Sequence, residues 1–398
     1  MSRPEPIYLD NNATTHLAPE VIEELTHLFS KGVVNPASRH RPGRKSLSIL
    51  EEAKSQLLDL IDAPKNGMAS AQIIITSGGT EANNLAINGI ANDDDSLIIV
   101  GATEHPSVLD AATHLKHRCR VLPVDLHGRC DLDVLRTWLE DIFSGKDPRF
   151  SRVGLVSMML GNNETGVIND LREACRICDA FQVPVHSDIV QAIGKIPFSM
   201  LDSGVSAVTL TAHKFHGPIG VGALVARHDL KIAPTLLGGG QQLGMRPGTE
   251  PVILTAAMVC ALQLSVESTS CGDYRRLGEL RDQFERRVCQ IFADNSALRA
   301  VVIGKEAERL PQTSTISFIG QDRQALLMAL DLAGIACSTG SACSSGSGRP
   351  SHVLQAMGLP RETIDGALRF SLSRFTTETE IDAAIGVIDK VTSRCLTN

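Results

Sequence analysis

The sequence predicts an α/β protein with a mainly parallel central sheet. Short apolar runs typical of buried strands alternate with segments of helical apolar spacing, and a polar loop follows each run. The strand-like runs lie at 72–76, 96–100, 153–159, 183–186 and 206–210. Strands that alternate with helices build parallel βαβ units, and ligands bind beyond the carboxyl ends of such strands. The polar loops are therefore the candidate functional segments.

The remaining elements are predicted from apolar periodicity, taken in order. A short strand with a polar turn is expected at 6–15, helices at 19–29 and 46–61, and a long helical region from 255 to 292. Residues 300–398 should form a smaller α/β unit, with strands at 313–319 and 367–372 and helices at 324–332 and 378–391. Residues 337–351, CSTGSACSSGSGRPS, are rich in Ser and Gly and predict a mobile loop.

Composition narrows the class of protein. The 398 residues carry a formal net charge of −7, which gives no electrostatic footprint for nucleic acid. We expect no membrane span, because no apolar run approaches the roughly 18 residues required, and no secretion signal, because MSRPEPIYLD lacks an apolar core. The expected location is the cytoplasm. Cys175 and Cys178 form a C-x-x-C inside a helical pattern without a second pair, so no metal site is expected.

The lysine loop, residues 209–222 (TLTAHKFHGPIGVG), follows the last strand-like run. A Lys at a buried strand end must be paired or lose its charge. The glycines that follow Lys214 allow the backbone to approach a ligand closely. A lysine held in this way is suited to a Schiff base with a carbonyl cofactor. The alternative is a surface turn with a solvated lysine.

Three other loops carry candidate residues. Gly79 and Thr80 in SGGT lie between a strand and a helix, where backbone amides can hold phosphate, although such turns are common. His105 in TEHPS could stack on a flat ring or shuttle protons, or could be merely structural. Asp188, three residues before Gln191, could keep a pyridine nitrogen protonated or could cap a helix.

Two residues near the C-terminus complete the set of candidates. Cys343 lies in the Ser/Gly-rich loop, and a free thiol there is both a strong nucleophile and an oxidation liability, so it calls for a functional explanation. Arg369 lies in ALRFSLSRF, an alternating pattern typical of a strand. It could clamp a carboxylate through two parallel hydrogen bonds or serve in a structural ion pair.

The order of these motifs along the chain resembles the cysteine desulfurases. The series is YLDNNATT, NPAS, TSGGTEANN, TEHPSV, NNETG, SDIVQAIGK, TAHKFHGP, RPGTE and STGSACSSG, and it extends from residue 8 to about 382. The long cysteine loop is similar to that of the nitrogen-fixation and housekeeping iron–sulfur subgroup. The resemblance implies a pyridoxal 5'-phosphate enzyme of fold type I. It implies a large cofactor-binding domain at 16–255 with a mainly parallel seven-stranded sheet, and a small domain from 1–15 and 256–398 that carries the cysteine loop at about 337–351.

The resemblance also implies a role for each matching residue. Lys214 is the Schiff-base lysine and proton shuttle, and Cys343 is the nucleophile that accepts sulfur. His105 stacks on the cofactor ring and assists proton transfer. The other implied residues contact the ring, the phosphate or the substrate carboxylate: Asp188 at the pyridine nitrogen, Gln191 and Asn163 at the phenolic oxygen, Gly79, Thr80, Thr211 and His213 at the phosphate, Thr249 at the phosphate from a second subunit, and Arg369 with Asn163 and Asn35 at the substrate.

The implied reaction converts L-cysteine to L-alanine and leaves the sulfur as a persulfide on Cys343. The implied partners are a second copy of the chain and a sulfur-acceptor or cluster-scaffold protein. A selenocysteine lyase, a non-catalytic sulfur carrier of the same fold and an ordinary aminotransferase are the alternatives. Three positions depart from the family pattern: Gln242 and Leu243 replace an acidic and a basic residue, and Arg349 stands where an acidic residue is common. Thr211 replaces the commoner Ser and retains a hydroxyl.

Overall fold

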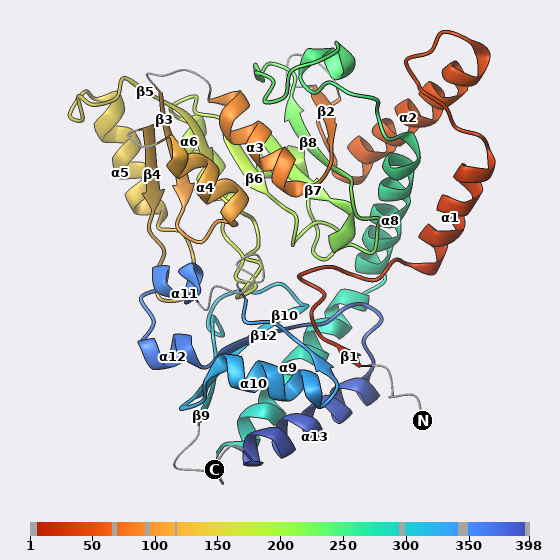
Figure 1. Ribbon diagram of the computed structural model, residues 1–398. Coiled ribbons are helices and arrows are strands. Elements are labelled where there is room, and N and C mark those ends of the chain that lie inside the picture. Colours follow the sequence, from red (N-terminus) through yellow and green to blue (C-terminus); the bar gives the residue numbers. More distant parts are fainter. Residues whose placement is uncertain are drawn as a thin grey trace.

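The computed structural model describes residues 6–65, 70–91, 96–115, 118–293, 299–340 and 349–394. Figure 1 shows a large α/β unit above a smaller one, with both ends of the chain near the smaller unit. The predicted α/β class, with a mainly parallel seven-stranded sheet and a smaller C-terminal α/β unit, is confirmed.

The central sheet has the order β2-β8-β7-β6-β5-β3-β4. Its strands are β2 (Ala71–Thr76), β3 (Ser96–Gly101), β4 (Cys119–Leu122), β5 (Arg152–Ser157), β6 (Val185–Asp188), β7 (Ala207–Thr211) and β8 (Gly222–Arg227). β8 runs antiparallel to both of its neighbours, β2 and β7, and the other pairs are parallel. The five predicted runs are all strands of this sheet. β4 and β8 were not predicted, because β4 is short and partly exposed and β8 adjoins the glycines of the lysine loop.

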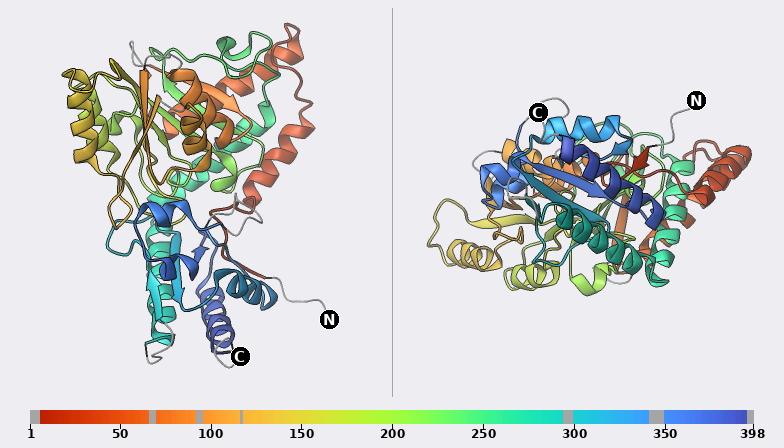
Figure 2. Two further views of the ribbon diagram at one scale, coloured as in Figure 1. Left: turned by 60° about the vertical axis from the view of Figure 1, so that its left-hand side comes forward. Right: turned by 90° about the horizontal axis from the view of Figure 1, so that it is seen from below.

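Helices cover both faces of the sheet, as the two views of Figure 2 also show. Along β3, Leu97 and Ile99 face the largest core, whereas Ile98 and Val100 face a separate core on the other side. This alternation is the two-residue period of a strand buried on both faces. The largest core contains residues of α2 (Arg41–Leu60), α5 (Leu132–Phe143), α6 (Leu171–Asp179), α7 (Met200–Ser203) and α8 (Val252–Ser270), and the opposite face is covered by α3 (Gly79–Ile90) and α4 (Pro106–His114).

The predicted helical region from 255 to 292 is two helices, α8 and α9 (Asp273–Ile291). The break falls at Gly272, whose φ of +89° is in the left-handed region that favours glycine. α8 has a mean hydropathy of 1.6, which makes it, within the described ranges, the one helix long and apolar enough to cross a membrane. The expectation that no run reaches that length is therefore wrong. Half of that stretch is buried inside the protein, where α8 packs against α1 (Pro19–Ser30) and α2.

The smaller unit has its own core, with Phe284, Phe318 and Phe370 at its centre. β10 (Thr313–Ile319) pairs antiparallel with β12 (Ala367–Ser371) and with β9 (Arg299–Val302). This sheet packs with α9, α10 (Arg323–Leu332) and α13 (Glu378–Arg394). Two short helices, α11 (His352–Ala356) and α12 (Arg361–Asp365), lie at the side of the unit (Figure 1).

The N-terminal segment joins the smaller unit, because β1 (Ile7–Tyr8) pairs with β11 (Ile335–Ala336) and Leu9 belongs to the second core. The predicted division of the chain at residues 255 and 256 stays a prediction. Ala257 to Leu262 of α8 pack in the largest core, with the first unit.

Candidate active site

Lys214 lies where the sequence predicted it, directly after β7, in the 3-10 turn η3 (Ala212–Lys214). Its Nζ donates hydrogen bonds to the carbonyl oxygens of Asn12 at 2.6 Å and Ala13 at 2.7 Å. The turn is held against α8, since a Cβ added at Gly217 would lie 3.1 Å from the Cβ of Ala261. Lys214 is therefore a partly buried amine that is directed at the polar N-terminal turn, and the alternative of a solvated surface lysine does not hold.

A chain of hydrogen bonds joins His105, which follows β3, to Asp188 at the end of β6. The Nδ1 of His105, at the N-cap of α4, lies 2.7 Å from the Oγ of Ser107. The side-chain nitrogen of Asn83 donates to that Oγ at 2.8 Å and to the Oδ2 of Asp188 at 2.7 Å. The Oδ1 of Asp188 accepts from the backbone of Val190. The Asp188 residue is 5% exposed, and its carboxylate accepts hydrogen bonds from these two donors.

The two histidines of the site, His105 and His213, both have lowered pKa values. Burial lowers the pKa of His105, and nearby Lys214 also lowers it, whereas Asp188 opposes this shift. Burial, with the charges of Lys214 and Lys195, lowers the pKa of His213 to about 4. Both imidazoles are therefore neutral at pH 7, and a neutral ring can stack on a flat cofactor and accept a proton.

Gln191 and Lys214 donate hydrogen bonds to the same acceptor. Its Nε2 donates to the carbonyl oxygen of Asn12 at 2.9 Å, the same oxygen that accepts from Lys214. The side chain of Asn12 in turn donates to the carbonyl oxygen of Asn163 and to the hydroxyl of Thr313. The N-terminal turn thus connects the ends of β5, β6 and β7 to the smaller unit.

Three of the predicted phosphate residues, Gly79, Thr80 and Thr211, meet at the start of α3, whereas the Nδ1 of His213 lies 3.2 Å from the Oγ1 of Thr14. Gly79 opens this helix, where the first backbone amides have no partner within the helix and attract anions. A Cβ at Gly79 would lie 3.6 Å from the Cγ2 of Thr211, so the two segments are in contact. The hydroxyl of Thr211 donates to Val221 and retains its acceptor capacity. Thr80 and His105 line a common cavity of about 530 Å³.

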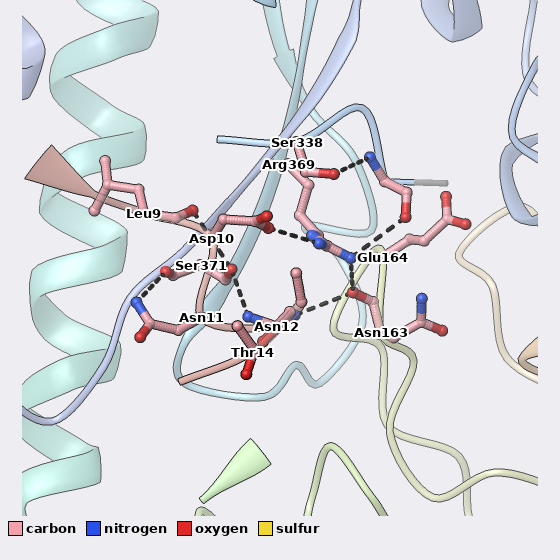
Figure 3. Close-up of polar contacts among 12 residues, drawn as sticks. Leu9, Asp10, Asn11, Asn12, Thr14, Asn163, Glu164, Ser338, Arg369 and Ser371 are labelled. Carbon is pink, nitrogen blue, oxygen red and sulfur yellow. Dashed lines mark hydrogen bonds and ion pairs between the residues drawn. The ribbon is translucent and has the colours of Figure 1, made fainter. Parts of the chain in front are cut away.

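Arg369 projects from β12 into the junction of the two units, as Figure 3 shows. Its guanidinium is 2% exposed, and its Nη2 lies 2.8 Å from the Oδ1 of Asp10. Its Nη1 donates to the carbonyl oxygens of Asn163 at 3.0 Å and Gly340 at 3.4 Å. The Nε is buried and has no hydrogen-bond partner among the described residues. The structure thus gives Arg369 an ion pair and also leaves one donor for a ligand.

Glu164 lies between the two described ends of the predicted cysteine loop. Its Oε2 accepts from the Oγ of Ser351 at 2.5 Å, and a Cβ at Gly340 would lie 2.7 Å from the same oxygen. Burial raises the pKa of Glu164, and the Ser351 hydrogen bond opposes this shift. Cys343 itself lies outside the described residues.

Asn35 and Thr249 do not join this site within one chain. They line a separate cavity of about 340 Å³, and the described hydrogen bond of the Asn35 side chain comes from Ala37. Figure 1 shows the connection between α1 and α2 on the far side of the large unit from β12, which carries Arg369. The role of Asn35 beside Arg369 at the substrate therefore stays a prediction.

The position of Gln242 now has a structural account. It lies in η4 (Gln241–Gly244), where Gln242 and Leu243 both have positive φ. The Gln242 amide accepts from the backbone of Ile75 at 2.6 Å and donates to the carbonyl oxygen of that residue at 2.9 Å, so it pairs with the edge strand β2 as a neighbouring strand would. Arg349 is exposed, and nothing in the structure explains its departure from the family pattern.

The fold and the strand-end lysine, aspartate and histidine define a pyridoxal-phosphate enzyme of fold type I, and the model of the family "Aminotransferase class-V" matches residues 7–384. A cysteine desulfurase of Cereibacter sphaeroides is 37% identical over 97% of this chain and 96% of the relative. The cysteine desulfurase NifS of Azotobacter vinelandii is 34% identical over 98% of this chain and 93% of the relative. The X-ray structure of a NifS-like protein from Rickettsia africae superposes with a TM-score of 0.85 at 31% identity, covering 98% of this chain and all of that one. The chain belongs to the cysteine desulfurase family, and the resemblance drawn from the motifs is confirmed.

Pyridoxal 5'-phosphate is the cofactor of this family, and the residues present fit it. The cofactor needs an amine, a carboxylate for its ring nitrogen, a flat partner for its ring and an anion site for its phosphate. Lys214, Asp188, His105 and the start of α3 at Gly79 supply these four features, and they stand at or shortly after the ends of β7, β6, β3 and β2. The buried Asp188 carboxylate, which no cation pairs among the described residues, is the observation that favours this fit most.

The sequence reasoning missed several residues that organise the site. Asn12 joins Lys214 to Gln191, Asn83 joins Asp188 to Ser107, and Asp10 pairs with Arg369. The motifs that contain them, YLDNNATT and TSGGTEANN, belong to the ordered motif series, so a signal for them is present in the sequence. Their roles required the pairing of segments that are up to 359 residues apart, which periodicity does not predict.

Proposed function

We propose that this protein is a pyridoxal-phosphate-dependent cysteine desulfurase. It converts L-cysteine to L-alanine and transfers the sulfur to Cys343, as a persulfide destined for iron–sulfur clusters or other thio-cofactors. The observation that carries the proposal is that Lys214 and Gln191 both donate to the carbonyl oxygen of Asn12. This shared contact adds to the hydrogen-bond chain that joins Asp188 to His105. Membership of the cysteine desulfurase family supports it.

The residues act as follows. When bound, the cofactor withdraws electrons from the substrate Cα, which weakens the Cβ–S bond. Lys214 would hold the aldehyde carbon of the cofactor, and its Nζ would move the Cα proton of the substrate. Arg369 holds the substrate carboxylate, for which its buried Nε is available. The neutral ring of His105 stacks on the cofactor and accepts a proton.

The sulfur transfer balances without an added oxidant or reductant. The Cys343 thiolate attacks the substrate sulfur, the S–S bond forms as the Cβ–S bond breaks, and the electron pair of the broken bond remains on the carbon skeleton. Protonation of that carbon gives L-alanine. Asp188, held by its two hydrogen-bond donors, would lie at the cofactor's ring nitrogen and keep that nitrogen protonated.

The decisive experiment uses purified holoprotein, L-cysteine and no reductant. We expect the peptide that contains Cys343 to gain one sulfur in mass spectrometry, with release of alanine, and both effects to disappear in Cys343→Ala. An unmodified Cys343 with normal cofactor absorbance would contradict the proposal, and rapid turnover of selenocysteine in its place would favour a lyase of that substrate. Absence of any borohydride-reducible cofactor would favour a non-catalytic carrier.

The active form is proposed to be a homodimer in which Thr249, and Asn35 beside it, reach the site of the other subunit. Both residues are exposed and line one cavity, which supports this arrangement. Mixed dimers test it: Lys214→Ala and Thr249→Ala chains should complement each other when co-assembled, because one of the two sites is then intact. A cytoplasmic location and a sulfur-acceptor or cluster-scaffold partner are also proposed, with membership of the cysteine desulfurase family in support.

A further inference from the structure

A second lysine is buried beside the site and has no part in the reaction above. Lys195 is 5% exposed, and its Nζ lies 3.3 Å from the Oε1 of Gln191. Among the described residues no carboxylate is within ion-pair distance of this amine. Burial of an amine with a single neutral partner is unfavourable, so its retention at this position calls for a functional reason.

The backbone aims Lys195 at the site. Gly194, directly before it, has a φ of +71°, and a Cβ there would lie 2.7 Å from the Cβ of Ser265 in α8. The hydroxyl of Thr269, one turn further along α8, donates to the carbonyl oxygen of Gly194 at 2.9 Å. Ser265 also donates to the carbonyl oxygen of Phe215, next to Lys214. The two lysine-bearing turns therefore rest on the same part of α8.

The orientation of the Gln191 amide follows from the chemistry of its neighbours. A protonated lysine can only donate, so it requires the Oε1 of Gln191 to face it. The carbonyl oxygen of Asn12 can only accept, so it requires the Nε2. The two contacts agree on one orientation, in which the N–H groups of Gln191 face the side of Lys214.

We propose that Lys195 is a positioning residue: it fixes the Gln191 amide as a hydrogen-bond donor toward the cofactor site. This inference rests on the proposed function, in which Gln191 serves an anionic oxygen of the cofactor. A flipped amide would present its oxygen to that anion and repel it. Lys195 opposes the flip, because a flipped amide would no longer present its Oε1 as the acceptor for the Lys195 amine.

The local charges are consistent with this role. Burial and the charge of Lys214 lower the pKa of Lys195 to about 7. The other titratable groups that interact with it are His213 and His216, and Arg374 acts on His216 in turn. The protonated amine can only donate to Gln191, whereas the neutral amine can also accept, so Lys195 holds the amide most firmly below pH 7.

The test compares Lys195→Met, which has no donor, with Lys195→Gln, which retains an amide donor. The first readout is cofactor affinity, measured by absorbance titration of the apoprotein. The second is the pH midpoint of the visible Schiff-base band. In Lys195→Met we expect a dissociation constant about 10-fold higher, from the loss of roughly one hydrogen bond, and a midpoint at higher pH, because the anionic oxygen becomes more basic without its donor.

Lys195→Gln should retain most of the wild-type behaviour, and it also serves as the test if Lys195→Met does not fold. Lys31→Met, at an exposed lysine after α1, is the matched control and should change neither readout. In a Gln191→Leu background, Lys195→Met should have little further effect, because the two residues act through one contact.

Two results would overturn the inference: wild-type affinity and midpoint in Lys195→Met, or an undiminished effect of that change in the Gln191→Leu background. Failure of the proposed function is distinguishable from these. In that case the wild-type protein itself would show no visible band that borohydride reduces and that Lys214→Ala abolishes, and the inference would fall with it.

Discussion

Replacement of Arg369 by Gln tests the site and the junction of the two units together. The side chain is 2% exposed, and that of its partner Asp10 is 20% exposed. Breaking a buried ion pair from one side typically costs ~3–5 kcal/mol, because the remaining charge stays buried without a partner. Asp10 can regain some water, so we expect the lower limit, about 3 kcal/mol of unfolding free energy.

The reverse change, Asp10→Asn, leaves the cation its hydrogen bonds to Asn163 and Gly340. It should therefore destabilise the protein less, by about 2 kcal/mol. Chemical unfolding followed by circular dichroism measures both variants and the double variant. A coupling energy of about 1–2 kcal/mol is expected, and additive effects would show that the Asp10–Arg369 pair does not form in solution.

The same variants separate structure from substrate binding. If Arg369 holds the substrate carboxylate, Arg369→Gln loses charge-assisted hydrogen bonds worth about 3 kcal/mol, and the KM for L-cysteine rises roughly 100-fold. Asp10→Asn keeps the guanidinium, so its KM should change by less than about 5-fold. An unchanged KM in a folded Arg369→Gln protein would refute the assignment of the substrate role.

Three further predictions concern single contacts. Burial lowers the pKa of His186 from 6.5 to about 3, so this residue binds a proton when the protein unfolds in acid. The stability that it contributes above pH 6.5 is therefore lost as the pH falls toward 3, and the free energy of unfolding should decrease by about 2 kcal/mol between pH 7 and 5. This decrease should be absent in a folded His186→Asn variant. Gln242→Ala removes both hydrogen bonds to Ile75 and should lower the free energy of unfolding by about 1–2 kcal/mol. Amide hydrogen exchange in β2 should then be faster, and unchanged exchange would contradict this interpretation. Ser351→Ala leaves the buried Glu164 carboxyl without its hydroxyl donor and should cost ~1–3 kcal/mol, whereas Ser351→Thr, which keeps the hydroxyl, should cost less.

Much of the fold was determined by the sequence alone. The strands β2, β3, β5, β6 and β7 were predicted because each is a buried apolar run with a polar loop after it, and local apolar pattern depends on few distant contacts. Lys214, Asp188 and His105 could be proposed for the same reason: each stands in the first polar residues after such a run. Their roles came from the resemblance of the ordered motifs, since any single motif is common.

The tertiary structure decided which residues meet. Asp10 and Arg369 are 359 residues apart and form one ion pair, and Asn12 serves both Lys214 and Gln191 from a turn at the other end of the chain. It also decided the position of Lys195, which in the sequence is one lysine among many and in the fold is a buried amine facing Gln191. Apolar periodicity encodes which face of a segment is buried, but hydrogen bonds between polar side chains depend on angstrom-scale distances that only the packed chain establishes.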